Sequence, residues 1–410
     1  MSRTTKRTRG TGHEGARGHE SAAAERARDA GHEPADERAR TGEHGPRGGA
    51  QADTAPDRGR RTRVARGLGG APAQPRELGP LAEATPVQAI GRPAMSHGEH
   101  FRRDHFPAPE TSCQAWELEI TGAVANPLTL TLADLHALVT AEARVVLECA
   151  GHRRMEHDPP PAGLPWELGA VGEATWGGAP LKRVLGLAVP LASARFVRLV
   201  GADRGETARG SVEPYARTIP LDKAQEASTL LAHAVNGEPI SCRRGGPVRA
   251  IVPGWYATDS VKWLTTVELR EEPGEGFFDV DDYRFRALGD EGPGLRMDRM
   301  PIHALITSPT DAAQAGPVLV EGAVWGGRGG VARVEVSIDG GNWQIADLNS
   351  PRGPFARRFW SLMWEAPAGE HQLAVRATDA SGEVQPSEPP PNAAGYANNS
   401  IHRIACRIYG

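Results

Sequence analysis

The feature that most constrains this chain is a break in its composition near residue 94. Residues 1–94 contain no Phe, Trp or Tyr, so all the aromatic residues (8 Phe, 9 Trp and 5 Tyr) lie beyond that point. A stretch built from Arg, Gly, Ala, Glu, Asp and Pro buries too little apolar surface to offset the entropy lost on ordering. We therefore expect 1–94 to be a disordered, low-complexity extension, with globular structure beginning near residue 95.

Two further interpretations of this extension stay open. Gly-His-Glu recurs at residues 12–14, 18–20 and 31–33, and sequence rich in His and Arg is also typical of metal-binding or nucleic-acid-binding tails. Its mixed charge favours a solvated extension instead. Globular composition starts at Met95, so translation from Met95 rather than Met1 is the third interpretation.

Length and charge bound the class of protein. With 410 residues, the chain has room for two or three domains. Its formal net charge of −4 argues against a nucleic-acid partner held by bulk positive charge. No apolar run approaches the ~18 residues of a membrane helix. We expect neither a nucleic-acid partner nor a membrane span.

The cysteines and the N-terminal sequence bear on compartment and cofactor. Four cysteines are too few for a disulfide scaffold, and none lies in a Cys-x-x-Cys-His motif, so we expect no haem attached to this chain. Arg60-Arg61 is not followed by an apolar stretch, so a twin-arginine export signal is not indicated. The cytoplasm is the default expectation, and a periplasmic location stays open.

The sequence beyond residue 94 divides into two patterns. Residues 95–295 carry short strand-like runs, a short helix at 132–139 with Thr131 as its N-cap, and dense Gly and Pro, which predicts an irregular α+β domain. Residues 296–410 carry alternating runs such as 334–338, which is followed by the turn sequence Asp-Gly-Gly-Asn. This second pattern predicts an all-β, immunoglobulin-like sandwich.

Cys149 is the residue with the most distinctive chemical context. It follows an apolar strand and precedes Gly151 and Arg153-Arg154, a positive environment that favours the thiolate. A Cys–His nucleophile with His152 or His157 lacks a third orienting group, and zinc lacks a full ligand set. A heavier metal held by one thiolate, with arginines binding an anionic cofactor and substrate, is the third chemical interpretation. A small buried residue at a strand end is the structural alternative.

Residues 148–154, Glu-Cys-Ala-Gly-His-Arg-Arg, resemble the cysteine motif of the sulfite oxidase family of molybdenum enzymes. Further blocks agree with that family in order and spacing over about residues 97–408. They are Phe101–Pro107, Trp166–Gly172, Trp176–Gly178, Ile219–Leu221, Asn236–Pro239, Gly246–Arg249, Val252–Tyr256, Ser260–Leu264 and Gly395–Arg403.

The resemblance implies a molybdopterin-binding domain at 95–295, an Ig-like dimerisation domain at 296–410, a molybdenum–molybdopterin cofactor and a homodimer. It implies that Cys149 is the protein ligand to the metal. The residues that match the family's cofactor contacts are Phe101, Arg102, Arg103, Asp104, His105, Cys149, Asp203, Arg244, Arg249, Ser260, Val261 and Lys262.

The resemblance also implies a substrate pocket and a reaction. Arg103, Arg154 and Arg358 match the pocket's arginines, with the register at Arg357/Arg358 uncertain by one residue. Tyr283 matches the active-site tyrosine, and Trp166 matches a tryptophan beside the pocket. The implied reaction is oxygen-atom transfer with a small oxyanion, first of all sulfite to sulfate, with electrons passed to a separate cytochrome or to oxygen. Nitrate or sulfoxide reduction, or a non-catalytic molybdopterin-binding role, are the alternatives.

Three positions depart from the family pattern. His152 stands where the family often has Asn, and Arg244 stands where a histidine contacts the pterin. Arg357 stands where Trp is usual, a change that bears on the preferred oxyanion more than on the metal.

Overall fold

The computed structural model describes residues 76–79, 81–110 and 115–410, and its first element is a small antiparallel sheet. That sheet pairs β1 (Arg76–Gly79), β2 (Ala82–Ala84) and β3 (Arg102–Arg103), and the short helix α1 (Val87–Ile90) follows β2. The prediction of disorder is therefore wrong for residues 76–94, because small side chains such as Ala82 and Ala89 are buried there together with Ile90. Residues 1–75 lie outside the described part of the chain.

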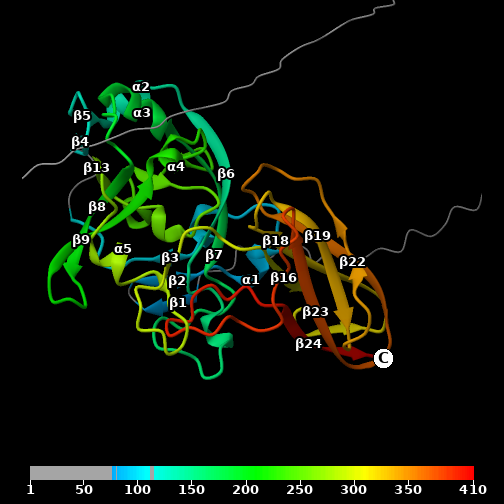
Figure 1. The fold of residues 1–410 in the computed structure, drawn as a ribbon. Coiled ribbons are helices and arrows are strands. Elements are labelled where there is room, and N and C mark those ends of the chain that lie inside the picture. Colours follow the sequence, from blue (N-terminus) through cyan, green and yellow to red (C-terminus); the bar gives the residue numbers. More distant parts are fainter. Residues whose placement is uncertain (1–75, 80, 111–114) are drawn as a thin grey trace, which may run out of the picture. The chain divides into compact units, whose positions relative to one another are not determined.

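Two five-stranded sheets form the body of the first domain, which is drawn from cyan to yellow-green in Figure 1. One sheet has the order β11-β10-β7-β6, with β12 also paired to β10, and the other has the order β5-β4-β13-β8-β9. The strands are β4 (Glu117–Gly122), β5 (Leu128–Thr131), β6 (Ala141–Glu148), β7 (Val171–Pro180), β8 (Phe196–Glu206), β9 (Val212–Pro220), β10 (Leu230–Val235), β11 (Glu238–Pro239), β12 (Arg249–Ile251) and β13 (Leu264–Arg270).

Short helices connect these strands, as the dense Gly and Pro predicted. They are α2 (Leu132–Ala137), α3 (Leu181–Ala188), α4 (Leu221–Gln225) and α5 (Phe277–Val280), with single 3₁₀ turns at His97–Glu99, Arg154–Glu156, Cys242–Arg244 and Ala257–Asp259. Thr131 caps α2 as expected: its hydroxyl accepts from the Asp134 N–H at 3.2 Å, and the Asp134 carboxylate accepts from the Thr131 N–H at 2.9 Å. The predicted α+β class is confirmed.

The second domain is the predicted β-sandwich. Its sheets have the orders β16-β18-β22-β21 and β17-β24-β23-β19-β20, and Val334, Val336, Leu373 and Val375 fill the core between them. A small hairpin, β14 (Arg284–Phe285) with β15 (Leu295–Arg296), precedes it, so the predicted boundary at 295/296 falls inside β15. The sandwich strands are β16 (His303–Ser308), β17 (Ala312–Gln314), β18 (Gly316–Trp325), β19 (Val331–Ile338), β20 (Gln344–Ile345), β21 (Asp347–Leu348), β22 (Arg358–Ala366), β23 (Gly369–Asp379) and β24 (His402–Tyr409).

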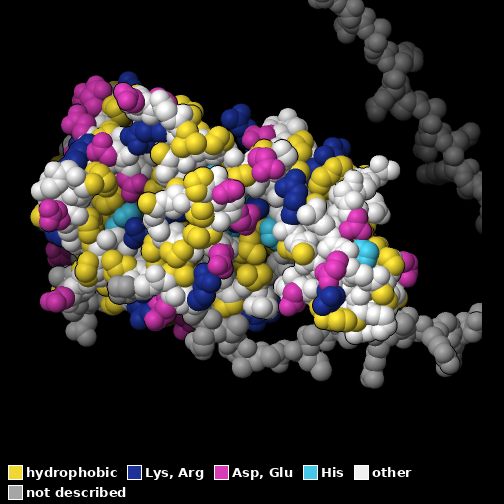
Figure 2. All heavy atoms as spheres, turned by 90° about the horizontal axis from the view of Figure 1, so that it is seen from below, with side chains coloured by type: hydrophobic (Ala, Val, Ile, Leu, Met, Phe, Trp, Pro, Cys, Tyr) yellow, Lys and Arg dark blue, Asp and Glu magenta, His cyan; other side chains and the backbone are white. Residues whose placement is uncertain are grey.

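The two domains share a buried contact along β6. The Val146 N–H donates to the Phe355 carbonyl at 3.0 Å, and Val146 is buried in one apolar cluster with Leu305 and Trp325 of the sandwich. Ile90 of α1 joins the same cluster. On the face seen in Figure 2, basic and acidic side chains are interspersed rather than gathered by sign. Within the described residues, no helix is both long and apolar enough to cross a bilayer.

The burial of Ile90 tests whether the segment before Met95 is part of the fold. The Ile90 side chain is 0% exposed, so Ile90→Ala leaves a cavity between the domains and should lower the free energy of unfolding by about 2–5 kcal/mol. Urea denaturation measures the change, with exposed Gln88→Ala as the matched control on the same helix. Equal midpoints for the two variants would contradict the packing described here.

Candidate active site

Cys149 lies at the end of β6, where the chain turns sharply away from the sheet. Its N–H donates to the Ala170 carbonyl at 2.9 Å, and its carbonyl accepts from the His152 N–H at 2.9 Å. Arg153 then adopts φ 59°, the left-handed conformation that completes the turn. The loop places the thiol of Cys149 in the walls of two adjoining cavities.

The first cavity, here called the cofactor cavity, gathers ten of the twelve predicted cofactor residues. It is lined by His97, His100, Phe101, Arg102, Arg103, His105, Leu147, Cys149, Trp176, Asp203, Tyr215, Arg244, Arg249, Ala257, Thr258, Ser260, Lys262 and Tyr283. Sequence reasoning missed His97, His100, Trp176 and Tyr215. Trp176 opens the motif Trp176–Gly178 and residues 97–100 directly precede the motif Phe101–Pro107, whereas Tyr215 lies in β9 outside every motif, where the pairing with β8 is irregular.

Two predicted cofactor residues lie behind the wall rather than in it. The buried Asp104 carboxylate is an ion-pair partner of both Arg102 and Lys262, so it orients two basic groups that do line the cavity. The Val261 side chain is 0% exposed in the core, and its carbonyl accepts from the Ala250 N–H at 2.8 Å. Both residues thus position the wall and do not face the cavity.

The cofactor cavity holds positive charge that the protein does not neutralise. Arg249 donates only to the carbonyls of Arg244 and Ser260, at 3.2 and 3.1 Å, and its Nε has no partner among the described residues. Burial lowers the pKa of Arg249 to about 9. A buried cation of this kind needs an anion, and a phosphate-bearing ligand supplies one.

Unpartnered polar atoms in the same cavity fit the heterocyclic part of a pterin. Asp203 Oδ1 is buried without a hydrogen-bond partner in the described structure, and burial raises the pKa of this carboxyl to about 7. His100 Nε2 and Trp176 Nε1 are likewise buried without partners. A ligand rich in N–H and C=O groups would satisfy such atoms, whereas a purely apolar ligand would leave them unpaired. The residues present therefore fit an anionic pterin cofactor.

The second cavity, here called the substrate cavity, shares Arg103, His105, Cys149 and Tyr283 with the first. Its remaining walls come from the loop after Cys149, from Asp282 beside Tyr283, and from the C-terminal part of the sandwich domain. These additional lining residues are Arg154, Ala162, Gly163, Leu164, Trp166, Asp282, Ala394 and Tyr396. Three of the four residues predicted for catalysis, Arg103, Arg154 and Tyr283, are thus brought together beside Cys149.

Arg154 reaches this cavity because three glycines leave room for it. A Cβ on Gly163 would overlap the Arg154 guanidinium, and a Cβ on Gly151 or Gly395 would come within 2.9 or 3.0 Å of its side chain. The guanidinium also lies 5.3 Å from the centre of the Tyr396 ring. Its Nε has no hydrogen-bond partner in the described structure, so the group is free to bind an anion.

Tyr283 is held in place from both sides. Its hydroxyl is hydrogen-bonded to His105 Nε2, and its ring stacks on that of Tyr396 with 5.7 Å between centres. Its backbone has φ 48° and donates to the Asp282 carboxylate at 2.8 Å. Burial raises the pKa of Tyr283 well above its ordinary value, which keeps the hydroxyl protonated and able to donate.

The structure does not bring Arg358 to either cavity. Its guanidinium donates to the Asn349 carbonyl at 2.8 Å and lines a separate cavity near Arg328. Shifting the predicted register by one residue, to Arg357, does not bring an arginine to the substrate cavity either. Arg357 is buried and donates to the Ile90 and Arg92 carbonyls at 2.7 and 2.8 Å. The sandwich domain instead contributes Tyr396, which lies in the motif Gly395–Arg403, and Ala394, which lies just before it.

The pKa of the Cys149 thiol does not follow the sequence prediction, which expected the thiolate to be favoured. Burial raises its pKa above the ordinary value, and this outweighs the opposing effects of the Gly151 N–H, Arg154 and Arg103. The predicted arginines are present, but alone they do not favour the thiolate. Cys149 would be held as the thiolate when it ligates a metal, because the thiolate is the form that coordinates.

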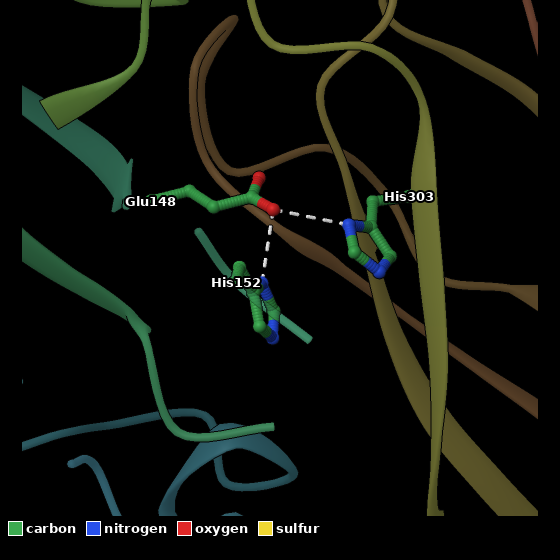
Figure 3. A group of neighbouring side chains, drawn as sticks. All are labelled: Glu148, His152 and His303. Carbon is green, nitrogen blue, oxygen red and sulfur yellow. Dashed lines mark hydrogen bonds and ion pairs between the residues drawn. The ribbon is translucent and has the colours of Figure 1, made fainter. Parts of the chain in front are cut away.

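Behind Cys149, a buried network joins the two domains (Figure 3). The Glu148 carboxylate lies 2.9 Å from His152 Nδ1 and 3.1 Å from His303 Nδ1, and it accepts from the Trp325 indole N–H at 2.7 Å. His303 and Trp325 belong to the sandwich domain. His152 therefore faces this network and not the metal side of the loop.

The composition of this network also suits a metal ion, but its contacts argue against one. The guanidinium of Arg153 lies 3.1 Å from His303 Nε2, and a second cation there would be repelled. His152 Nε2 is already bonded to the Leu168 carbonyl at 3.0 Å. We interpret the group as a hydrogen-bonded clamp between the domains.

Removing the charge of Glu148 tests this clamp. Glu148→Gln keeps the size of the side chain, yet its amide cannot accept from both imidazoles and the indole at once. We expect the free energy of unfolding to fall by about 1.5–3 kcal/mol, the range for losing a hydrogen bond to a charged group. Urea denaturation should show a much smaller change for Glu142→Gln, an exposed position on the same strand. A similar small change in both variants would rule out the clamp.

Comparisons with known proteins agree with this geometry. Residues 105–278 match the family described as oxidoreductase molybdopterin binding domain, and residues 296–408 match the Mo-co oxidoreductase dimerisation domain. The mitochondrial sulfite oxidase of Mus musculus is 35% identical over 333 residues, covering 75% of this chain and 60% of that protein. The sulfite oxidase of Gallus gallus is 32% identical over 352 residues, covering 79% of this chain and 75% of that protein.

A solved structure supports the same assignment. The sulfane dehydrogenase SoxCD from Paracoccus pantotrophus has a TM-score of 0.71 and 27% identity, covering 83% of this chain and 91% of that one. The chain spans about 60% of the length of its mouse relative. The matched domains identify molybdenum–molybdopterin as the cofactor that the cavity accommodates. The chain belongs to the sulfite oxidase family of molybdopterin-binding oxidoreductases.

Proposed function

We propose that this protein oxidises a small sulfur oxyanion, sulfite to sulfate, and passes the electrons to a separate cytochrome or to oxygen. One observation carries the proposal: Arg103 and Arg154 face Cys149 in one cavity, and neither forms an ion pair with a carboxylate of the described chain. Two guanidinium groups left unpaired beside the predicted metal ligand form a site for an anion.

The residues divide the work between the two cavities. Arg102, Arg244, Arg249 and Lys262 would bind the cofactor's anionic group, and Cys149 would ligate molybdenum, which when bound supplies two-electron oxygen-atom transfer. Arg103 and Arg154 would hold the substrate oxygens, with the Tyr283 hydroxyl donating a further hydrogen bond. Trp166, 1% exposed, limits access of water from one side. Sulfite and water give sulfate, two protons and two electrons.

The alternatives fit these contacts less well. A sulfoxide carries no charge, so it would leave both guanidinium groups without a counter-ion. Nitrate reduction needs the same cofactor and stays a second candidate, which an assay with nitrate and a reduced dye would reveal. We also propose a homodimer, because residues 296–408 match a dimerisation domain. The cytoplasmic location stays a prediction from sequence.

Loss of the metal ligand is the first test. Protein made in a molybdopterin-competent host should contain stoichiometric molybdenum and reduce ferricyanide when sulfite is added. Cys149→Ser should abolish sulfite-dependent reduction, because no other thiol lines the described cavities. Molybdenum bound without sulfite turnover would refute the substrate and leave the cofactor assignment standing.

The glycines around Arg154 provide a second test. Gly163→Ala would push the Arg154 guanidinium out of place, and Gly163 has φ 124°, which disfavours any side chain. Losing one charged hydrogen bond, about 1.5–3 kcal/mol, should lower kcat/KM for sulfite roughly 10- to 100-fold. Molybdenum content should not change. Gly186→Ala on α3, where a Cβ meets nothing within 4 Å, is the control that should keep full activity.

A further inference from the structure

We propose that the substrate cavity also accepts organic sulfinates, R–SO₂⁻, and oxidises them more efficiently than sulfite. The proposal rests on the proposed function, since it uses the same cavity and the same chemistry. Two features of the substrate cavity support it: the net charge of the side chains that line it and the apolar part of its surface. The sandwich domain, from which a third arginine was expected, supplies only uncharged Ala394 and Tyr396.

The charges that line the substrate cavity suit a single negative charge. Two guanidinium groups, those of Arg103 and Arg154, face one carboxylate, that of Asp282. His105 adds no charge, because burial and the nearby Arg103 hold its pKa well below the ordinary value. The side chains other than Cys149 therefore leave a net single positive charge. A monoanion balances it, whereas dianionic sulfite brings one negative charge too many into a partly closed site.

The surface of the cavity suits a substrate with an apolar part. Ala162, Leu164, Trp166 and Ala394 line it together with the Tyr396 ring, and its cavity volume is about 200 Å³. A water molecule needs about 10–15 Å³ of cavity volume measured in this way, so this space is large for a four-atom anion. A sulfinate can place its oxygens at the two arginines and its organic group against this apolar surface, which favours binding because apolar surface is removed from water.

The reaction is the same two-electron oxidation. A sulfinate sulfur carries a lone pair, as sulfite sulfur does. R–SO₂⁻ and H₂O give R–SO₃⁻, two protons and two electrons; one S–O bond forms and the C–S bond stays intact. The electrons pass to the acceptor that the proposed function already requires.

The test compares substrates on the molybdenum-loaded full chain at pH 8, where sulfite is a dianion. With ferricyanide as acceptor, kcat/KM for methanesulfinate and benzenesulfinate should exceed that for sulfite by about tenfold, the ratio that ~1.4 kcal/mol gives. Calorimetric titration with the unreactive products is independent of turnover. Methanesulfonate should bind about tenfold more tightly than sulfate.

Two variants change the charge of the cavity in different ways. Ala394→Arg adds a cation, and Asp282→Asn removes the carboxylate while its amide oxygen can still accept from Tyr396 and Tyr283. Each should move the sulfinate-to-sulfite ratio of kcat/KM about tenfold toward sulfite. The matched control is Ala393→Arg, because Ala393 is exposed and does not line the cavity; it should leave the ratio unchanged.

The outcomes separate the two proposals. Sulfite oxidised faster than either sulfinate, or sulfate bound as tightly as methanesulfonate, would overturn this inference and leave the proposed function standing. Failure to oxidise either kind of substrate with molybdenum bound would overturn the proposed function and this inference with it.

Discussion

The uncompensated positive charge around Cys149 is the constraint on which the rest of this structure depends. Burying a guanidinium without a carboxylate is unfavourable, and Arg249 and Arg154 are both buried in this way. Backbone carbonyls, aromatic rings and glycines surround these two guanidinium groups, in place of carboxylates. The guanidinium carbon of Arg249 lies 5.0 Å from the centre of the Trp176 ring. The guanidinium carbon of Arg154 lies 5.3 Å from the centre of the Tyr396 ring. These guanidinium groups therefore form binding sites for the anionic groups of the cofactor and the substrate.

Much of the cofactor cavity could be predicted, because its contacts come from short continuous motifs. Phe101–His105 and Ser260–Lys262 each place several contacts within a few residues, so motif matching found them together. It could not separate side chains that face the cavity from those behind it, as Asp104 and Val261 show. That distinction depends on which way each side chain points, which the sheet pairing decides.

The substrate cavity was harder to predict, because its second half comes from the other end of the chain. Arg358 matched by position in a motif, but β22 carries it to another cavity, where backbone carbonyls bind it. The disorder predicted for 76–94 failed for a related reason. Absence of aromatic residues excludes an independent core, yet Ala89 and Ile90 are buried against partners that the sandwich and β6 supply. Composition measures what a segment can bury by itself, not what it adds to a neighbour.

The order of residues along the chain has a consequence for assembly. Every residue that lines the cofactor cavity lies between His97 and Tyr283, whereas the substrate cavity also needs Ala394 and Tyr396, close to the C-terminal strand β24. As the chain emerges during synthesis, the groups for the cofactor are therefore all present before the substrate cavity has its last wall. The sandwich domain then supplies the last wall of the substrate cavity, through Ala394 and Tyr396. The part of the site that selects the substrate is therefore also the last part to be synthesised.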